Sequence, residues 1–334
     1  MSTEAHDDEN RSIIEAFLSG QQDALPADHR SGFVAVVGKP NVGKSSLVNA
    51  LVGHKVAIIS PKPQTTRRRL MGILTQPEAQ VIFVDTPGIH QPRQAINRFM
   101  VGEAEAALRD CDIVLFVTDV SHMPNEDDQR VAERIRALPQ PKLLAMNKAD
   151  LVKPQQLAEH VEAHQALLQA ELPPLTDQGS PVEQPAMLVS ALRGDNLDKL
   201  LALLLERLPY GPRYFPAGQH TDQSQQMLAA ELVREQALAV LEDEVPHVLA
   251  VAIEDWQQRP NGVVFIAATL YVERDSQKMI VIGRGGERLK QIGTRARHEI
   301  ERELGQRVFL ELWVKVRPGW RKDERLVERF LRAS

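Results

Sequence analysis

The chain has 334 residues, of which 43% are hydrophobic and 25% charged, and its formal net charge is −5 at pH 7. This length allows two domains, and the composition is ordinary for a globular protein. The charge balance argues against wholesale nucleic-acid binding but allows a local basic face. The single cysteine, Cys111, excludes a disulfide framework, no cysteine or histidine spacing suggests zinc, and no stretch approaches the roughly 18 apolar residues of a membrane span.

Residues 1–30 contain an acidic cluster formed by Glu4, Asp7, Asp8 and Glu9. They lack the basic start and the apolar core of a signal peptide. We expect an acidic, flexible extension, and the lone cysteine fits a reducing cytoplasm.

Residues 38–45 match the phosphate-loop pattern G-x-x-x-x-G-K-[ST], between an apolar run at 33–37 and a predicted helix at 46–52. Glycines let backbone N–H groups converge on one anion where the helix begins. Lys44 is predicted to reach the β- and γ-phosphates, and Ser45 to bind Mg²⁺. The predicted nucleotide contacts in this stretch are Gly38, Lys39, Pro40, Asn41, Val42, Gly43, Lys44, Ser45 and Ser46.

Two strands are predicted at 69–74 and 81–84, after a loop that contains Thr65 and Thr66. The second strand ends in Asp85, Thr86, Pro87 and Gly88. A carboxylate at this position can hold Mg²⁺ through water, and the Gly88 amide can meet a γ-phosphate. Its distance after the phosphate loop favours a nucleotide site over a simple turn.

The sequence next predicts a helix at 96–108, a strand at 113–117, a helix at 125–138 and a strand at 142–146. The last strand is followed by Asn147, Lys148, Ala149 and Asp150. Guanine presents adjacent N1–H and N2 donors that one carboxylate can accept, whereas adenine presents neither. We assign Asp150 to that role, Asn147 to bracing the pocket and the Lys148 stem to lying along the base. Such a site rejects a base that leaves its polar groups unpaired.

A helix at 154–172, a loop at 173–185, a strand at 186–189 and a helix at 196–208 complete this half. After the strand, Ser190, Ala191 and Leu192 could offer a backbone N–H to the guanine O6. Alternating strands and helices predict an α/β domain with a mostly parallel sheet, helices on both faces and ligands at the carboxyl ends of the strands. We therefore expect a P-loop nucleotide-binding domain over residues 31–208.

The order of these motifs resembles the G1, G3 and G4 boxes of translation-factor-class GTPases. Residues 63–67, Pro-Gln-Thr-Thr-Arg, resemble the G2 switch of the Era-like branch. The resemblance implies that Thr66, or alternatively Thr65, senses the γ-phosphate through Mg²⁺. The candidate metal ligands are then Ser45, Thr66 and Asp85, and the candidate catalytic residues are Lys44, Thr66, Gly88 and Asn41.

Some GTPases orient the attacking water with a glutamine just after the Asp-x-x-Gly box, where this chain has Ile89. We therefore expect slow intrinsic hydrolysis of GTP to GDP and phosphate. In related GTPases an asparagine at the position of Asn41 helps to hold K⁺, and the similarity implies the same here. The alternative is that Asn41 only shapes the turn.

The strand–helix alternation stops at a proline-punctuated linker, residues 209–220. Residues 221–334 predict a helix at 225–241, strands at 248–254 and 263–272, a helix pair around residues 283–286, a strand at 308–316 and a helix at 321–331. Ile-Gly-x-x-Gly between two helices is how a KH domain grips a nucleic-acid backbone. The predicted RNA contacts are Gly283, Arg284, Gly285, Gly286 and Lys290.

Residues 32–330 as a whole resemble Era-like GTPases that carry a C-terminal type II KH domain. The resemblance implies a ribosome-assembly factor whose KH domain binds the single-stranded 3′ end of 16S rRNA on the 30S subunit, and we expect a monomer. It also implies a link to cell-cycle control and peripheral association with the inner membrane. Two alternatives stay open: an RNA-binding module in which hydrolysis contributes little, and a membrane GTPase whose second domain contacts protein or lipid.

Overall fold

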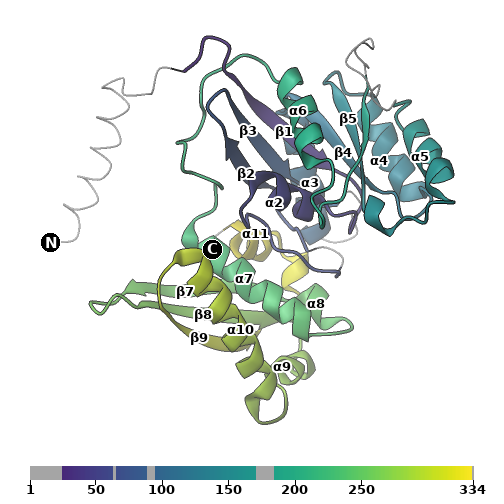
Figure 1. The fold of residues 1–334 in the computed structure, drawn as a ribbon. Coiled ribbons are helices and arrows are strands. Elements are labelled where there is room, and N and C mark those ends of the chain that lie inside the picture. The colour runs from purple at the N-terminus through teal and green to yellow at the C-terminus, as the bar shows by residue number, and fades with distance from the viewer. Residues whose placement is uncertain (1–24, 63–64, 89–94, 171–183, 333–334) are drawn as a thin grey trace.

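A computed structural model describes residues 25–62, 65–88, 95–170 and 184–332. Most of the acidic extension, Pro63, Gln64, Ile89 and most of the 173–185 loop lie outside these residues. The described chain forms two β-sheets, each with its own helices, and the larger one lies above the smaller one in Figure 1.

The first sheet has six strands in the order β2-β3-β1-β4-β5-β6, and all neighbours are parallel except β2 and β3. The strands are β1 (Arg30–Val37), β2 (Leu70–Thr75), β3 (Ala79–Asp85), β4 (Ile113–Asp119), β5 (Lys142–Asn147) and β6 (Ala186–Leu188). The strand order changes direction at β1, so the loop after β1 lies at the crevice where doubly wound sheets bind ligands.

Five helices cover the two faces of this sheet: α2 (Lys44–Val52), α3 (Ala95–Arg109), α4 (Glu126–Arg136), α5 (Leu157–Ala166) and α6 (Leu197–Arg207). Side chains alternate along β1, so that Val34 and Val36 pack with α2 and α6, whereas Ala35 and Val37 pack with α3, α4 and α5. Burial on both faces explains why the strands are continuously apolar. The predicted P-loop α/β fold is confirmed.

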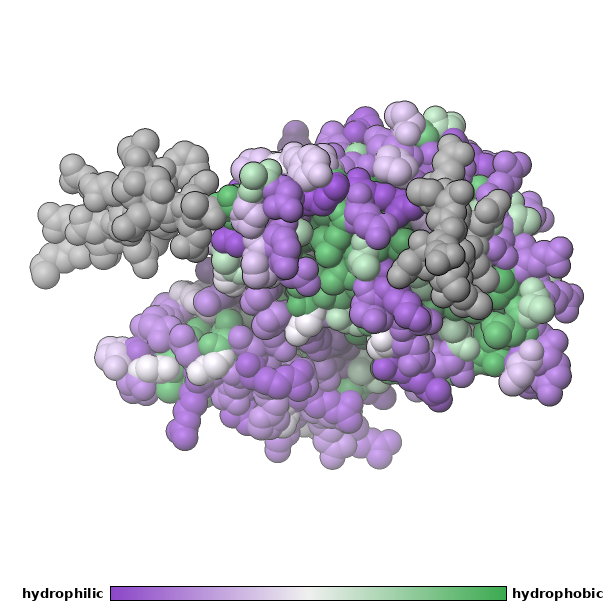
Figure 2. All heavy atoms as spheres, turned by 45° about the horizontal axis from the view of Figure 1, so that its top comes forward, coloured by the Kyte–Doolittle hydropathy of each residue, from purple (hydrophilic) through white to green (hydrophobic). Residues whose placement is uncertain are grey.

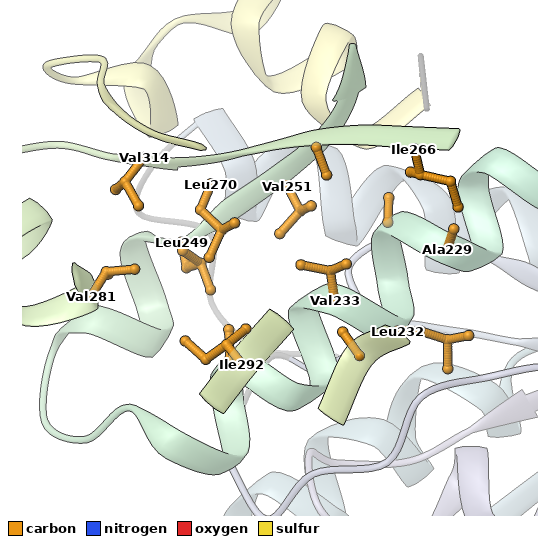
Figure 3. Packing of buried hydrophobic residues seen from close by; sticks show 14 of the residues in the cluster. Ala229, Leu232, Val233, Leu249, Val251, Ile266, Leu270, Val281, Ile292 and Val314 are labelled. Atoms are coloured by element: carbon orange, nitrogen blue, oxygen red, sulfur yellow. The ribbon is translucent and has the colours of Figure 1, made fainter. Parts of the chain in front are cut away.

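The second sheet has the order β7-β8-β9, antiparallel and then parallel. Its elements are α7 (Gln225–Val240), α8 (Val245–Val248), β7 (Ala250–Gln258), β8 (Val264–Val272), α9 (Asp275–Ile282), α10 (Glu287–Leu304), β9 (Val308–Val316) and α11 (Glu324–Arg332). Short 3-10 turns lie at η2 (Arg284–Gly286) and η3 (Trp320–Lys322). Val233, Ile292 and Val314 meet in a core between α7, α10 and the sheet (Figure 3). This arrangement confirms the predicted KH fold.

Several boundaries differ from those predicted, and three of the differences have a local cause. The helix expected at 154–172 is α5, which begins only at Leu157 because residues 154–156 form a turn. The strand expected from residue 248 begins at Ala250, since the short helix α8, with Pro246 in its first turn, extends to Val248. The terminal helix is divided into η3 and α11, and the Asp323 carboxylate accepts hydrogen bonds from the first amides of α11.

The stretch predicted as a linker packs along the first sheet. Arg30 forms a β-bridge with Tyr210, and Gly72 forms one with Thr221. The Ser31 hydroxyl also donates to the Pro212 carbonyl at 2.6 Å. These contacts tie the start of the second half to the beginning of β1 and to the edge strand β2.

The two halves meet at a hydrophobic cluster. Ala95, Ile96 and Met100 of α3 pack with Trp320 and Phe330, and the cluster continues onto the sheet at Ala250, Ala252 and Tyr271. This cluster covers part of the sheet face that points away from α7 and α10.

Candidate nucleotide site and nucleic-acid groove

The phosphate loop links the end of β1 to the start of α2. A Cβ atom on Gly38 would lie 2.3 Å from the Val117 carbonyl oxygen, so only glycine fits beside β4. Gly43 has φ of 95°, in the left-handed region that glycine tolerates. The loop borders a cavity of ≈ 320 Å³, whose lining includes Lys44, Ser45, Thr66, Gly88 and Lys148. This volume lies within the range of small-molecule sites.

The Lys44 side chain is held by carbonyl groups of the phosphate loop. Its ammonium donates to the carbonyls of Gly38 at 3.1 Å and Lys39 at 3.0 Å, and the residue is only 6% exposed. Burial lowers the pKa of Lys44 to about 8, although the nearby Asp85 carboxylate acts in the opposite direction. An incoming phosphate would add the opposite charge that favours the ammonium form.

Three oxygen-bearing side chains converge next to Lys44. The Ser45 hydroxyl donates to Asp85 Oδ2 at 2.6 Å and lies 2.9 Å from Thr66 Oγ1, which is 3.4 Å from the same carboxylate oxygen. The other oxygen, Asp85 Oδ1, is buried without a hydrogen-bond partner among the described residues. Burial raises the pKa of Asp85, and a cation would reverse that effect. Hard oxygen ligands of this kind fit Mg²⁺.

Thr65 and Thr66 point in different directions. Thr65 Oγ1 donates to the Lys62 carbonyl at 2.7 Å, whereas Thr66 Oγ1 joins Ser45 and Asp85. Of the two threonines, the geometry therefore favours Thr66 as the metal ligand.

The Asp85-Thr86-Pro87-Gly88 segment is fixed against the phosphate loop. Thr86 donates to the Val36 carbonyl at 2.8 Å and is fully buried. A Cβ atom on Gly88 would lie 2.7 Å from the Pro40 ring. The close approach of these two loops requires glycine at position 88.

The predicted base-binding residues are braced by each other. Asn147 donates to the Val42 carbonyl at 2.9 Å and accepts a hydrogen bond from the Ala191 amide at 3.0 Å. The Ser190 hydroxyl donates to Asp150 Oδ1 at 2.7 Å and so orients that carboxylate. The Ala191 amide already donates to Asn147 and is therefore not available to a base. The next amide, that of Leu192, donates to none of the described residues and could donate to a base carbonyl.

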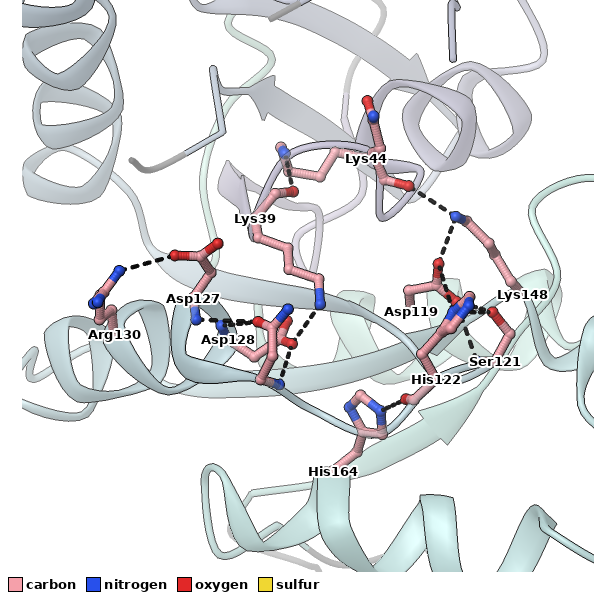
Figure 4. Close-up of polar contacts among 12 residues, drawn as sticks. Lys39, Lys44, Asp119, Ser121, His122, Asp127, Asp128, Arg130, Lys148 and His164 are labelled. Atoms are coloured by element: carbon pink, nitrogen blue, oxygen red, sulfur yellow. Dashed lines mark hydrogen bonds and ion pairs between the residues drawn. The ribbon is translucent and has the colours of Figure 1, made fainter. Parts of the chain in front are cut away.

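Some of the predicted nucleotide contacts are possible only through the main chain. The side chain of Lys39 turns away from the cavity to Asp128 of α4, and the N···O distance is 2.6 Å (Figure 4). The side chain of Leu192 is 87% exposed. Asn41 has φ of 64° and donates from Nδ2 to the Pro61 carbonyl at 3.0 Å. Asn41 thus shapes the turn, while its Oδ1 accepts no hydrogen bond from a described residue.

Two carboxylates near the site were missed by the sequence analysis. Asp119, at the carboxyl end of β4, binds Lys148 Nζ at 2.6 Å (Figure 4). Burial opposes ionisation of Asp119, but hydrogen bonds from Lys148 and Ser121 outweigh it and lower the pKa. A polar residue that ends a buried strand could have been noticed from the sequence. Asp128 carries no such signal, because its partner Lys39 lies 89 residues away.

The Gly-x-x-Gly segment lies between α9 and α10, as predicted. A Cβ atom on Gly283 would lie 2.7 Å from Arg288 Cβ, and φ of Gly283 is 74°. Arg284 and Lys290 are exposed. Beside them is a groove of ≈ 400 Å³, lined by Gly286, Leu289, Lys290, Gly293, Thr294, Arg297, Leu310 and Leu312. Glycine turns, cations and an apolar floor suit a nucleic-acid strand.

The face of the molecule in Figure 2 is mostly hydrophilic, with hydrophobic residues in separate patches. Among the described residues, no helix has both the length and the apolar character needed to cross a membrane.

Comparisons with known proteins cover both halves of the chain. Residues 33–148 match a family described as 50S ribosome-binding GTPase, and residues 244–321 match the KH domain family. A relative named GTPase Era, from Heliobacterium modesticaldum, is 43% identical over 301 residues, which cover 90% of this chain and 96% of the relative.

Two solved structures are similar over nearly the full length. One is Aquifex aeolicus Era with a tyrosine-to-alanine substitution, bound to GDP·AlF₄⁻, with a TM-score of 0.83 and 38% identity, covering 90% of this chain and 98% of that chain. The other is Era in complex with MgGDPNP and nucleotides 1506–1542 of 16S ribosomal RNA, with a TM-score of 0.82, 39% identity and the same coverage.

Proposed function

The chain belongs to the Era family of GTPases, and from that premise we propose that it is a GTP-dependent switch that binds the 3′ end of 16S rRNA and assists maturation of the 30S subunit. The single observation that carries the nucleotide half is the convergence of Ser45, Thr66 and Asp85 beside Lys44. The second half is supported by the groove beside the Gly-x-x-Gly turn and by the relative that holds 16S RNA.

We assign hydrolysis to charge stabilisation by the phosphate loop. Lys44 lies where its ammonium can pair with the β- and γ-phosphate oxygens, and the Gly88 amide can donate to the γ-phosphate. Ser45, Thr66 and Asp85 would hold Mg²⁺, which when bound would neutralise phosphate charge. The position after Gly88 is an isoleucine, so its side chain cannot orient water by hydrogen bonding, and intrinsic turnover is slow.

The base is read by Asp150 as guanine. Ser190 donates to one carboxylate oxygen and leaves the other for the guanine N1–H and N2 donors. Asn147 joins the base-binding turn to the phosphate loop, so the two ends of the nucleotide site are positioned together.

We also propose that Asn41 contributes Oδ1 to a K⁺ ion beside the β/γ bridge. Carbonyl oxygens bind such cations, and this oxygen is free of hydrogen bonds from the described residues. GTP turnover measured in K⁺ and in Na⁺ tests this role, and it should be faster in K⁺. Equal rates of GTP turnover in K⁺ and in Na⁺ would mean that Asn41 only shapes the turn.

The RNA partner is the small-subunit rRNA. The family that matches residues 33–148 is described as binding the 50S ribosome, but that match covers only the first domain. The Era structure that matches both domains is bound to 16S RNA, and we therefore favour the small-subunit RNA. We further propose a cytoplasmic monomer, with domains at 31–208 and 221–334, a linker at 209–220, and peripheral association with the inner membrane. A link between subunit maturation and cell-cycle control would follow from the nucleotide switch.

Titration of a 16S 3′-terminal oligonucleotide in GDP and in a GTP analogue tests the switch. We expect different affinities in the two states, because nucleotide and RNA binding must be coupled reciprocally. Identical affinities would reduce the protein to an RNA-binding module. Absence of RNA binding in both states, with binding to liposomes instead, would support a membrane GTPase.

Two variants separate the two sites. Lys44→Ala should abolish nucleotide retention. The double change Arg284→Asp with Gly285→Asp should weaken RNA binding while GTP turnover without RNA is kept, since both residues lie on the exposed turn away from the nucleotide cavity. Unchanged RNA affinity in the double variant would rule out this groove.

A further inference from the structure

The ammonium group of Lys148 has partners on two different loops. Its Nζ atom donates to the Asn41 carbonyl oxygen at 2.8 Å and to Asp119 Oδ2 at 2.6 Å (Figure 4). Asn41 belongs to the phosphate loop, and Asp119 is the last residue of β4. Lys148 follows β5 and lines the nucleotide cavity, whereas Asp119 is not among the residues that line it. The ammonium therefore joins the base-binding turn to the phosphate loop, and Asp119 supports it from outside the cavity.

The Asp119 carboxylate is held in one orientation by its own loop. Its Oδ1 atom accepts hydrogen bonds from the Ser121 amide at 3.1 Å and from the Ser121 hydroxyl at 2.5 Å. The side chain of Asp119 is only 12% exposed. Because Oδ1 is tied to the loop backbone, Oδ2 is presented to the Lys148 ammonium at a fixed place.

The loop that carries Asp119 is itself anchored to α5. His160 donates from Nδ1 to the Val120 carbonyl at 2.7 Å, and His164 donates from Nε2 to the His122 carbonyl at 2.9 Å. Both histidines are buried. Asp119 therefore lies on a rigid support, which a side chain needs if it is to position another side chain.

The hydrogen bond from Lys148 to Asn41 joins two residues with left-handed backbones. φ is 63° at Lys148 and 64° at Asn41, a region that residues with a side chain rarely adopt. Surrounding contacts must maintain such conformations, and a charge-assisted hydrogen bond to the Asn41 carbonyl is one of them. Without the Asp119 carboxylate the flexible lysine side chain would regain rotamer freedom, and this hydrogen bond would weaken.

We propose that Asp119 is a positioning residue for the nucleotide. Through the Lys148 ammonium it keeps the lysine stem along the guanine ring and keeps the Asn41 carbonyl in its place in the phosphate loop. This inference rests on the proposed nucleotide site and deepens it. Because Asp119 does not line the cavity, its loss should weaken nucleotide binding without changing which base is accepted.

Displacement of a fluorescent GDP analogue measures this role. Asp119→Asn keeps the shape of the side chain and removes its charge, so GDP should bind about tenfold more weakly, the difference between a charge-assisted and a neutral hydrogen bond. The KM for GTP should rise by the same factor while kcat stays within about twofold, because the contact is equally strong in the ground state and in the transition state. The preference for GDP over xanthosine diphosphate should stay at the wild-type value.

A double-mutant cycle shows whether the carboxylate acts through Lys148. Lys148→Met keeps an apolar stem and removes the ammonium, so adding Asp119→Asn to it should weaken GDP binding by less than about twofold further. If the two losses multiplied instead, Asp119 would act by another route and the proposal would be overturned. The matched control is Glu126→Gln, which removes the charge of an exposed partner of Arg130 in the same half and should change neither GDP affinity nor KM.

Thermal unfolding shows which variants fold. If Asp119→Asn does not fold, the milder Ser121→Ala decides, because it removes only one hydrogen bond from the Asp119 carboxylate. It should weaken GDP binding by about threefold, again in KM and not in kcat. Unchanged GDP affinity in the folded variant, beside normal wild-type binding, would overturn this inference alone. Wild-type protein that binds no GDP would overturn the nucleotide site together with it.

Discussion

Lys44 must carry its charge at the moment when nucleotide binds, yet its surroundings favour the neutral amine. Burial lowers its pKa to about 8 in the nucleotide-free chain. The bound phosphates raise the pKa again, so binding above pH 8 takes up a proton and becomes weaker as the pH rises. Between pH 7 and pH 9 we expect the GDP affinity to fall by about tenfold.

Calorimetric titration of GDP in buffers with different ionisation enthalpies measures that proton directly. Uptake should approach one proton near pH 9 and vanish near pH 7. A GDP affinity that stays constant over this interval would show that Lys44 is fully charged in the free protein.

Asp150 controls which base is accepted. Its carboxylate is oriented by the Ser190 hydroxyl at 2.7 Å. Asp150→Asn replaces one acceptor oxygen by a donor, so guanine loses a partner while xanthine, which has a carbonyl at C2, gains one. We expect GDP to bind at least about 100-fold more weakly and xanthosine diphosphate to bind better, as measured by competition. Unaltered GDP binding would remove Asp150 from base recognition.

At the scale of elements, the phosphate loop is anchored to α4 as well as to β1. The Lys39 ammonium meets the fully buried Asp128 carboxylate at 2.6 Å, and the same oxygen accepts the Asn125 amide that begins α4 (Figure 4). The Lys39 carbonyl in turn accepts a hydrogen bond from Lys44. The ion pair therefore positions the part of the phosphate loop that accepts the hydrogen bond from Lys44.

Asp128→Asn keeps the size of the side chain and removes its charge. We expect a loss of about 2 kcal/mol in unfolding free energy, the scale of a hydrogen bond to a charged group, together with weaker GDP binding. Asp127→Asn is the matched control, because Asp127 is adjacent but exposed, and its pair with Arg130 should contribute less than about 1 kcal/mol. If denaturant titrations gave the same loss of unfolding free energy for both variants, the buried ion pair would contribute no more to stability than the exposed one.

The elements predictable from the sequence are those whose pattern is local. The apolar run at 33–37, the glycine pattern at 38–45 and the alternation at 308–316 each identify their element, because burial, turn geometry and pleat act over a few residues. Contacts that join distant segments leave no such mark. Two examples are the ion pair between Lys39 and Asp128 and the hydrogen bond from the Ala191 amide to Asn147. The order of the strands in the sheet brings these residues together.

At the scale of the whole molecule, the loop beside the nucleotide cavity is tied to the second domain. Arg67, which directly follows Thr66, is buried and donates to the Leu249 and Pro246 carbonyls at 2.6 and 3.2 Å. Arg234 of α7 donates to the Thr65 carbonyl. The residues that could sense the γ-phosphate therefore contact the domain that holds the RNA groove, which sequence alone did not indicate.

Glu235 of α7 offers the sharpest test of this link. It accepts from the Lys55 ammonium at 2.6 Å and from the Ile59 amide at 3.0 Å, and Ile59 lines the nucleotide cavity. Glu235→Ala removes the contact of α7 with Lys55 and Ile59, so the ratio of RNA affinities between a GTP analogue and GDP should fall from the 5- to 150-fold typical of allosteric coupling to below about threefold. Gln226→Ala, on the exposed side of the same helix, should keep the wild-type ratio. A ratio that survives in Glu235→Ala would mean that the coupling runs through another contact between the two halves, such as Arg67 with the Leu249 carbonyl, Arg234 with the Thr65 carbonyl, or α3 with α11.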